Sequence, residues 1–242
     1  MKKIIMLKNL VRNNMTMEVE YAVFSEKGVR RSHQDICRLI EMPDRNRILM
    51  VVCDGMGGHV MGEVAAETVC NAVCGFWEEN PEYEDSVKKV KEACRHAADV
   101  LSQRSGSVRP IEMGTTLVMA AIEGNVLTVA HCGDSRCYLL RDGEVVHQTQ
   151  DHADPYMGSE RVLKCFFSTA PQVADPDVVR FEIRSGDRIF LCSDGVYKSM
   201  APHVLTARLQ DDKPLEQVVD VIKFMCEKFS TDNYTGILAK IL

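Results

Sequence analysis

Four aspartates, far apart in the chain, each stand at the end of a predicted strand and beside a glycine or an asparagine. They are Asp54, Asp134, Asp194 and Asp232. A carboxylate at a sheet edge has no packing role in a core, and several that converge form a set of hard oxygen ligands, the type that binds Mg²⁺ or Mn²⁺. Proteins with such a site usually use it on phosphate. The pattern therefore predicts a metal site for phosphate chemistry, although each aspartate taken singly is most simply a turn residue.

The segment RRSHQD adds an arginine and a further carboxylate. Arg30 offers a planar fork of N–H groups that matches phosphate oxygens, and Asp35 follows in the same segment. Asp54 comes directly after the apolar run LMVVC, and Gly55 lets the backbone approach a ligand closely and expose its carbonyl. Two neighbouring cations also need a carboxylate that bridges them. Together these residues favour hydrolysis of a phosphomonoester.

The glycine-rich run after Asp54, GMGGHVMG, does not match a dinucleotide-binding loop. A G-x-G-x-x-G fingerprint that starts at Gly55 requires glycine where the chain has Val60, and Asp54 would repel a pyrophosphate. The antiparallel strands predicted after this run also do not suit a doubly wound sheet.

Strands and helices must carry these side chains to one place. Alternating or continuous apolar runs predict strands, and apolar residues at helical spacing predict helices. The predicted strands cover 17–24, 36–42, 48–54, 114–124, 125–134, 135–143, 143–152 and 233–242, and the predicted helices cover 63–79, 83–105, 203–210 and 214–229. Residues 114–152 resemble an antiparallel meander, 151–177 are predicted to be irregular, and 178–194 a hairpin. Strands and helices do not alternate, so we expect an α+β fold of antiparallel sheets with helices outside them.

The composition excludes several classes of protein. A net charge of −6 argues against a general nucleic-acid binder, which would show a basic footprint. No apolar run approaches the roughly 20 residues that a membrane span needs. None of the ten cysteines forms a C-x-x-C pair, and most lie in apolar runs, so they are predicted to be small buried residues rather than zinc ligands. So many unpaired thiols predict a reducing, cytoplasmic location.

The chain length suits one domain, which we place at residues 17–242. Residues 1–16 are treated as an N-terminal leader. The leader is basic and its apolar block is short and interrupted by lysine, which does not fit a signal peptide. We expect it to be loosely packed, with a basic amphipathic surface helix as the alternative.

Six stretches, in this order, resemble the metal-dependent serine/threonine protein phosphatases of the PPM or protein phosphatase 2C family, of bacterial type. They are VRRSHQD, VVCDGMGGHVMGEVAAETV, MGTTLVMAAIEGNVLTVAHCGDSRCYLLRDGE, QTQDHA, GDRIFLCSDGV and TDNYTGILAKIL. Together they are far more specific than any one motif alone. The resemblance implies a four-layer α-β-β-α sandwich, in which two packed, mainly antiparallel sheets carry helices on their outer faces.

The resemblance also implies two Mn²⁺ or Mg²⁺ ions per subunit, in a cleft at one end of the sandwich. Asp54 would bridge both ions, and the Gly55 carbonyl would bind one of them. Asp194 and Asp232 would complete the other. The implied activity is hydrolysis of phosphoserine and phosphothreonine in proteins by a metal-activated water.

Four more residues have implied roles near this centre. Gln34 and Asp35 would bind directly or through water. Asp134 matches the acid of a third, weaker metal site, and Arg30 would hold the phosphate. The implied partners are phosphoproteins, among them a serine/threonine kinase and its targets, with no nucleic acid and no membrane. We expect a monomer.

The chain departs from the family's pattern at three places. His33 stands where asparagine is usual, which changes hydrogen bonding near the site or adds a group that titrates near neutral pH. Met56 stands where eukaryotic members carry a histidine proposed as the leaving-group acid, so that acid is unassigned. Residues 153–177 are shorter than the segment that usually forms a flap, which should leave the cleft more open and weaken substrate selection.

Two other functions are the alternatives. One is a metal-binding regulatory protein of the same fold with little activity. Such a protein usually loses a metal-ligating aspartate, whereas Asp54, Asp194 and Asp232 are all retained. The other is a phosphatase of a sigma-factor switch, which typically carries a sensor domain that this sequence has no room for.

Overall fold

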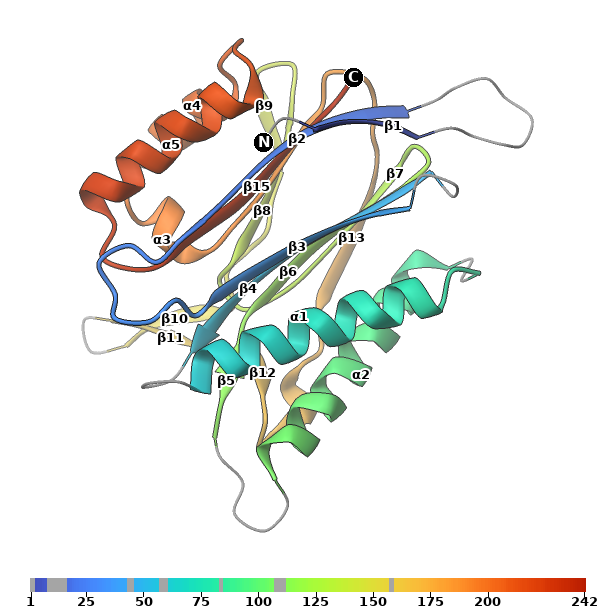
Figure 1. Cartoon of the computed structure of the whole chain (residues 1–242), viewed down its shortest axis with the longest axis vertical. Helices are drawn as coiled ribbons and strands as arrows, with labels where there is room; N and C mark the ends of the chain where they lie inside the picture. The colour runs from blue at the N-terminus through green and yellow to red at the C-terminus, as the bar shows by residue number, and fades with distance from the viewer. Residues whose placement is uncertain are drawn as a thin grey trace.

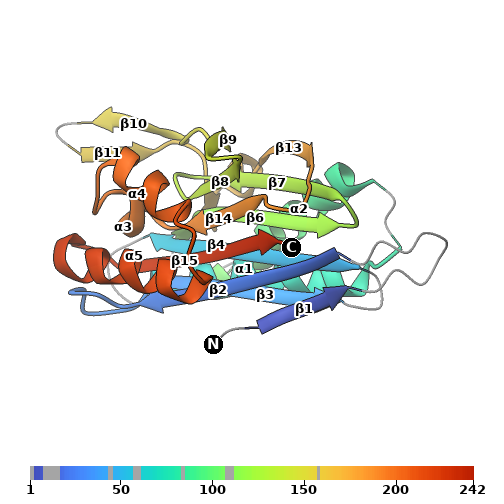
Figure 2. The same ribbon diagram turned by 90° about the horizontal axis from the view of Figure 1, so that it is seen from above.

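The computed structural model describes residues 3–7, 17–42, 46–56, 61–82, 85–106, 112–156 and 159–242. Two mainly antiparallel sheets pack face to face, and helices cover both outer faces (Figure 1). Figure 2 shows the same layers from above, with the strands of the two sheets running past one another. The structure confirms the predicted α+β class and the four-layer α-β-β-α sandwich.

The first sheet has the strand order β1-β2-β15-β14-β8-β9. Its strands are β1 Lys3–Leu7, β2 Met17–Glu26, β8 Arg136–Arg141, β9 Glu144–Gln148, β14 Arg188–Cys192 and β15 Tyr234–Ile241. The helices over its outer face are α3 Asp194–Tyr197, α4 Pro202–Leu209 and α5 Leu215–Phe229 (Figure 1). Strand β15 lies between β2 and β14, so segments from both ends of the sequence pair in the middle of this sheet.

The second sheet has the order β12-β5-β4-β6-β7-β13, and β3 also pairs with β4. Its strands are β3 Asp35–Met42, β4 Arg47–Met56, β5 Gly114–Thr115, β6 Leu117–Glu123, β7 Val126–Cys132, β12 Phe166–Phe167 and β13 Asp177–Glu182. Helices α1 Met61–Glu79 and α2 Ser86–Ser105 cover it (Figure 1). A hairpin of β10 Ala153–Tyr156 and β11 Ser159–Val162 pairs with neither sheet, and a 3-10 helix spans Pro171–Val173.

Strand β4 shows why the sequence makes layers. Its apolar run is buried throughout, and successive side chains of a strand point to opposite faces. Leu49 and Val51 belong to the core beneath α1 and α2, whereas Ile48 and Met50 belong to the core between the sheets. A third core lies under the helices of the first sheet. A continuous apolar run is thus the pattern of a strand that is covered on both sides.

Two strand connections differ from the prediction. β7 and β8 are not neighbours in a meander, because the chain passes from the second sheet to the first at residues 133–135. The predicted hairpin at 178–194 is also wrong, since β13 pairs with β7 while β14 lies between β15 and β8. Glycine and aspartate mark a hairpin turn and a corner between two sheets equally well, so the local sequence does not distinguish them.

Two further segments are more regular than expected. Residues 151–177, predicted to be irregular, contain the short strands β10, β11 and β12. Within the segment treated as a leader, Lys3–Leu7 forms β1 and pairs with β2. The rest of residues 1–16 lies outside the described residues.

The cysteines have the predicted structural role. All ten are free thiols, and nine are buried while Cys37 is half-buried. Cys70 and Cys74, one helical turn apart on α1, both belong to the core beneath that helix.

Among the residues that the structure describes, no helix is both long and apolar enough to cross a membrane.

Candidate metal centre and phosphate cleft

The predicted acidic residues meet at one end of the sandwich. Asp35 begins β3 and lies opposite Asp54 of β4 in the antiparallel register. Asp194 follows β14 as the first residue of α3, and Asp232 precedes β15. Because β3 and β4 belong to the second sheet and β14 and β15 to the first, both sheets supply carboxylates.

A cavity of about 760 Å³ lies over this group. Its walls hold most of the residues singled out from the sequence, namely Arg30, Gln34, Asp54, Gly55, Asp134, Asp194 and Asp232, and in addition Met56, Thr116, Val162, Lys198 and Asn233. Asp35 is not on the wall. It is 3% exposed and accepts a hydrogen bond from the Ser193 hydroxyl at 2.7 Å.

Hydrogen bonds and close packing fix the backbone at Asp54 and Gly55. The Asp54 N–H donates to the Thr116 hydroxyl at 3.1 Å, and the Thr116 N–H donates to the Asp54 carbonyl at 2.9 Å. The Gly55 N–H donates to the Gln34 carbonyl at 3.1 Å. A Cβ at position 55 would lie 2.2 Å from the Gly62 carbonyl oxygen. Only glycine fits, so this part of the cleft wall is bare backbone.

The carboxylate of Asp194 has one oxygen that no described residue satisfies. Its Oδ2 accepts a hydrogen bond from Lys198 at 2.9 Å, but Oδ1 is buried and has no hydrogen-bond partner among the described residues. The turn is held tightly, because a Cβ on Gly195 would lie 1.9 Å from the Asn233 carbonyl oxygen. A buried carboxylate oxygen without a donor points to a ligand such as a cation.

Burial and the charges of neighbouring acids raise the pKa values of four carboxyls at this site, those of Asp35, Asp54, Asp134 and Asp232. Burial is the largest cause for each of them. It raises the pKa of Asp54 well above its usual range, and the charges of neighbouring acids raise it further. The pKa of Asp35 rises to about 7, that of Asp134 to about 6, and that of Asp232 is also raised. The metal-free cluster therefore takes up protons readily, and a divalent cation at the same place would remove the penalty on the ionised forms.

Arg30 is held at the edge of the cleft by its neighbours. Its Nη2 donates to Asp232 Oδ2 at 2.6 Å and its Nε donates to the Thr231 carbonyl at 2.9 Å. Asn233 fastens the loop that carries the arginine, because its side chain bonds to the backbone of residues 27, 32 and 34 at 2.7, 3.0 and 2.9 Å. Sequence reasoning missed this role of Asn233, and its position directly after Asp232 is the only signal for it.

Lys198 is a second residue that sequence reasoning missed. Its Nζ lies 2.9 Å from Asp194 Oδ2 and 3.5 Å from Asp134 Oδ2. The i, i+4 spacing of Asp194 and Lys198 predicts a pair only on a helix, and the short helix α3 was not predicted.

His33 lies behind the cleft rather than on its wall. Its Nε2 hydrogen-bonds to the Ser25 hydroxyl at 3.2 Å, and Ser25 hydrogen-bonds to the Thr235 hydroxyl at 2.9 Å. Burial lowers the pKa of this imidazole from 6.5. His33 is therefore neutral at pH 7 and takes part in hydrogen bonding around the start of β15.

His131, His152 and Asp177 form another group of metal-binding side chains, with ligand atoms within 4.8 Å of one another. Gly133 N–H donates to His152 Nδ1 at 3.2 Å, so a neutral His152 carries its proton on Nε2, which faces Asp177 at 3.2 Å. A protonated nitrogen cannot bind a cation. His131 and His152 are also stacked, with ring planes 9° apart, so their lone pairs do not converge. This group anchors the start of the β10–β11 hairpin rather than a metal.

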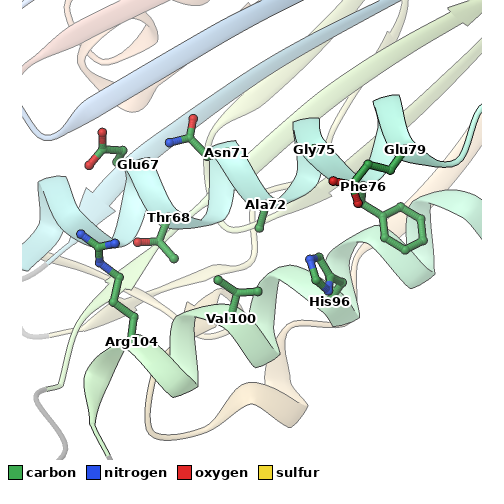
Figure 3. Close-up of a pocket in the computed structure, with 10 residues that line it drawn as sticks. All are labelled: Glu67, Thr68, Asn71, Ala72, Gly75, Phe76, Glu79, His96, Val100 and Arg104. Atoms are coloured by element: carbon green, nitrogen blue, oxygen red, sulfur yellow. The ribbon is translucent and has the colours of Figure 1, made fainter.

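A hollow of about 550 Å³ between α1 and α2 has a different character (Figure 3). Phe76 and His96 lie side by side at one end, with ring centroids 5.8 Å apart. Glu67 and Glu79 are at opposite ends of the hollow, so their carboxylates do not converge on one ligand (Figure 3). Convergent buried acids, rather than volume, therefore distinguish the cleft at the end of the sheets as the candidate site.

Comparison with known proteins supports the family resemblance seen in the sequence. A model of the protein phosphatase 2C family matches residues 28–242. Serine/threonine protein phosphatase PstP of Mycobacterium tuberculosis is 29% identical over 243 residues, which cover 94% of this chain and 46% of that protein, so the chain spans about half the length of this relative. Serine/threonine phosphatase stp of Listeria monocytogenes is 26% identical over 235 residues, which cover 88% of this chain and 91% of that protein.

A solved structure supports the same family. A crystal structure of the catalytic domain of PstP in complex with two manganese ions is 27% identical, has a TM-score of 0.74, and covers 93% of this chain and 98% of that one. The family model spans the cleft and both sheets. The chain belongs to the protein phosphatase 2C family.

Proposed function

We propose that this protein is a metal-dependent phosphatase that hydrolyses phosphoserine and phosphothreonine in other proteins. The observation that carries the proposal is the buried, unsatisfied Oδ1 of Asp194, which lies in a cleft with further carboxylates and Arg30. Membership of the family, and the names of the relatives from Mycobacterium tuberculosis and Listeria monocytogenes, support the substrate class.

Two Mn²⁺ or Mg²⁺ ions are assigned to the carboxylate cluster. Asp54 would bridge them, the Gly55 carbonyl would bind one, and Asp194 with Asp232 would bind the other. The raised pKa of Asp54 fits this assignment, because uncompensated negative charge is what a cation neutralises. Asp35 has one oxygen engaged by Ser193, so it would act through its other oxygen or through water.

When bound, these ions supply the Lewis acidity that activates a water for attack on phosphorus. The protein's own part is to position the phosphate. Arg30 is held by Asp232 and by the Thr231 carbonyl, so its fork is oriented before the substrate arrives and stabilises charge on the phosphate oxygens. None of the cysteines lines the cavity among the described residues, so a cysteinyl-phosphate intermediate is not part of the proposed reaction.

The biological setting follows from the same proposal. The substrates would be phosphoproteins, among them a serine/threonine kinase of the same cell and its targets. We place the protein in the cytoplasm because of its ten free thiols and expect it to act as a monomer. Residues 17–242 would form the single catalytic domain, and strand β1, within the segment 1–16, adds to the edge of its first sheet.

Hydrolysis of p-nitrophenyl phosphate and of a phosphothreonine peptide tests the function, with Mn²⁺, with Mg²⁺ and with EDTA. Asp194→Asn removes a proposed ligand at constant shape. Asp142→Asn is the matched control, because Asp142 is 78% exposed, pairs with Arg184 and lies outside the cleft. We expect turnover that requires metal. It should persist in the control and be lost in Asp194→Asn. A folded, Mn²⁺-loaded protein without turnover would indicate a metal-binding protein that is not an enzyme.

A further inference from the structure

The ammonium group of Lys198 lies between two carboxylates on the wall of the cleft. Its Nζ is 2.9 Å from Oδ2 of Asp194 and 3.5 Å from Oδ2 of Asp134. Asp194 begins α3, whereas Asp134 lies where the chain crosses between the sheets. All three side chains line the same cavity. The lysine thus joins two acids that come from distant parts of the sequence.

A further divalent cation held by the Oδ2 atoms of these two acids would compete with the ammonium for both of them. Mn²⁺ and Mg²⁺ sit roughly 2.0–2.2 Å from carboxylate oxygens. An ion that used Oδ2 of Asp134 and Oδ2 of Asp194 on the side of the ammonium would therefore overlap a group that already lies within 3.5 Å of both atoms. Two positive charges this close also repel each other strongly. Lys198 in this position and a cation at the same place exclude each other.

The two acids and the Tyr197 ring stabilise the charge of Lys198, whereas Arg136 is a second cation over the same ring and has its own acid partner. Lys198 Nζ lies 5.7 Å from the centroid of the Tyr197 ring, and Arg136 Cζ lies 3.5 Å from the same centroid. Arg136 is itself fixed by two hydrogen bonds to Asp151, at 2.8 and 2.7 Å. The backbone N–H of Lys198 donates to the Asp194 carbonyl at 2.9 Å. Aromatic faces attract cations, so the lysine is held by its backbone, by a ring and by two acids.

We propose that Lys198 takes the place of a third divalent cation, so that this protein binds two ions where Asp134 would otherwise help to hold one more. The inference rests on the proposed two-ion centre. In this arrangement Asp134 is the partner of a lysine rather than a metal ligand. Removing the charge at position 198 should expose a third cation site of weak affinity between Asp134 and Asp194.

Counting bound Mn²⁺ tests the inference without any assay of turnover. Purified protein would be freed of metal, dialysed against increasing Mn²⁺ up to the millimolar range, and its bound ions counted by atomic emission and by isothermal titration calorimetry. Lys198→Met removes the charge and keeps much of the apolar stem. Lys198→Arg keeps the charge, and Lys198→Met combined with Asp134→Asn removes the exposed site again. Circular dichroism would verify that each variant is folded.

The wild-type protein and Lys198→Arg should bind two ions, Lys198→Met three, and the double variant two. Three ions on the wild-type protein, or only two on folded Lys198→Met, would overturn the inference and leave the proposed phosphatase centre intact. Fewer than two ions on the wild-type protein would instead refute the two-ion centre, and the inference with it.

Discussion

Without divalent cations, this protein should lose stability as the pH rises from about 4 to about 7. Burial raises the pKa of the Asp35 carboxyl from 3.8 to about 7, and the charges of Asp194 and Asp232 act in the same direction. A carboxyl with a raised pKa in the folded state holds its proton more tightly there than in the unfolded chain. Its destabilising effect is therefore absent below the unfolded pKa of 3.8 and complete above the folded value of about 7.

The size of the effect follows from this pKa. Each pKa unit corresponds to about 1.4 kcal/mol, so ionising Asp35 in the folded, metal-free protein costs about 4 kcal/mol at neutral pH. That is a large part of the roughly 5–15 kcal/mol that stabilises a typical domain. The raised pKa of Asp54 adds an effect of the same sign. Mn²⁺ bound at the proposed centre should reverse the trend, because cations bind the ionised carboxylates.

Urea unfolding followed by circular dichroism, at pH values from about 4 to about 7.5, measures this effect. The free energy of unfolding should fall with pH for metal-free protein and rise with pH in saturating Mn²⁺. Asp35→Asn should reduce the fall by about 4 kcal/mol, whereas Asp142→Asn, at an exposed position, should leave it unchanged. Metal-free protein that gains stability towards neutral pH, or an unchanged slope in Asp35→Asn, would refute the reasoning.

Other substitutions test single contacts. Gly55→Ala places a Cβ 2.2 Å from the Gly62 carbonyl oxygen, so calorimetry should show Mn²⁺ affinity at least about tenfold lower. Gly75→Ala is the control, because a Cβ at this position on α1 meets open space. This control should raise the unfolding free energy by up to about 1 kcal/mol. Arg30→Lys keeps the positive charge but loses the planar fork of N–H groups, so kcat/KM should fall by about tenfold or more. An unchanged kcat/KM would refute the proposed binding of phosphate by Arg30. Asn233→Ala leaves backbone groups of the arginine loop unpaired and should lower the unfolding free energy by about 2–3 kcal/mol in urea.

The sequence predicts the layers of this fold better than their connections. Apolar runs identify β4 as a strand covered on both faces, and the structure confirms this because its alternate residues enter two different cores. Which sheet a strand joins depends on contacts between segments far apart. The corner at residues 133–135 and the one between β13 and β14 have the turn chemistry of hairpins, yet each changes sheet. Local pattern therefore identifies the strands, and tertiary packing decides their partners.

The acidic residues of the site could be predicted from the sequence. An aspartate beside a glycine at a strand end is common singly, but it is unusual for this combination to recur in one chain. Asp54 and Asp194 have this signature and line the same cavity. Side chains that act through a neighbour carry no such signature. Asn233 works by bonding a loop that lies far away in sequence, and Lys198 faces Asp134 only because the short helix α3 turns it into the cleft. Such roles depend on geometry that one sequence does not encode locally.

The supply of carboxylates by both sheets has a consequence for folding. Asp35 and Asp54 are neighbours in one sheet, while Asp194 and Asp232 flank strands of the other. A folding intermediate with only one sheet formed would present half of the proposed ligands and hold a cation weakly. Binding of the proposed ions would thus report that the two sheets have docked in the correct alignment, and it would stabilise the docked state over any slipped one. Tight cation binding would then be a property of the assembled pair of sheets and of neither sheet alone.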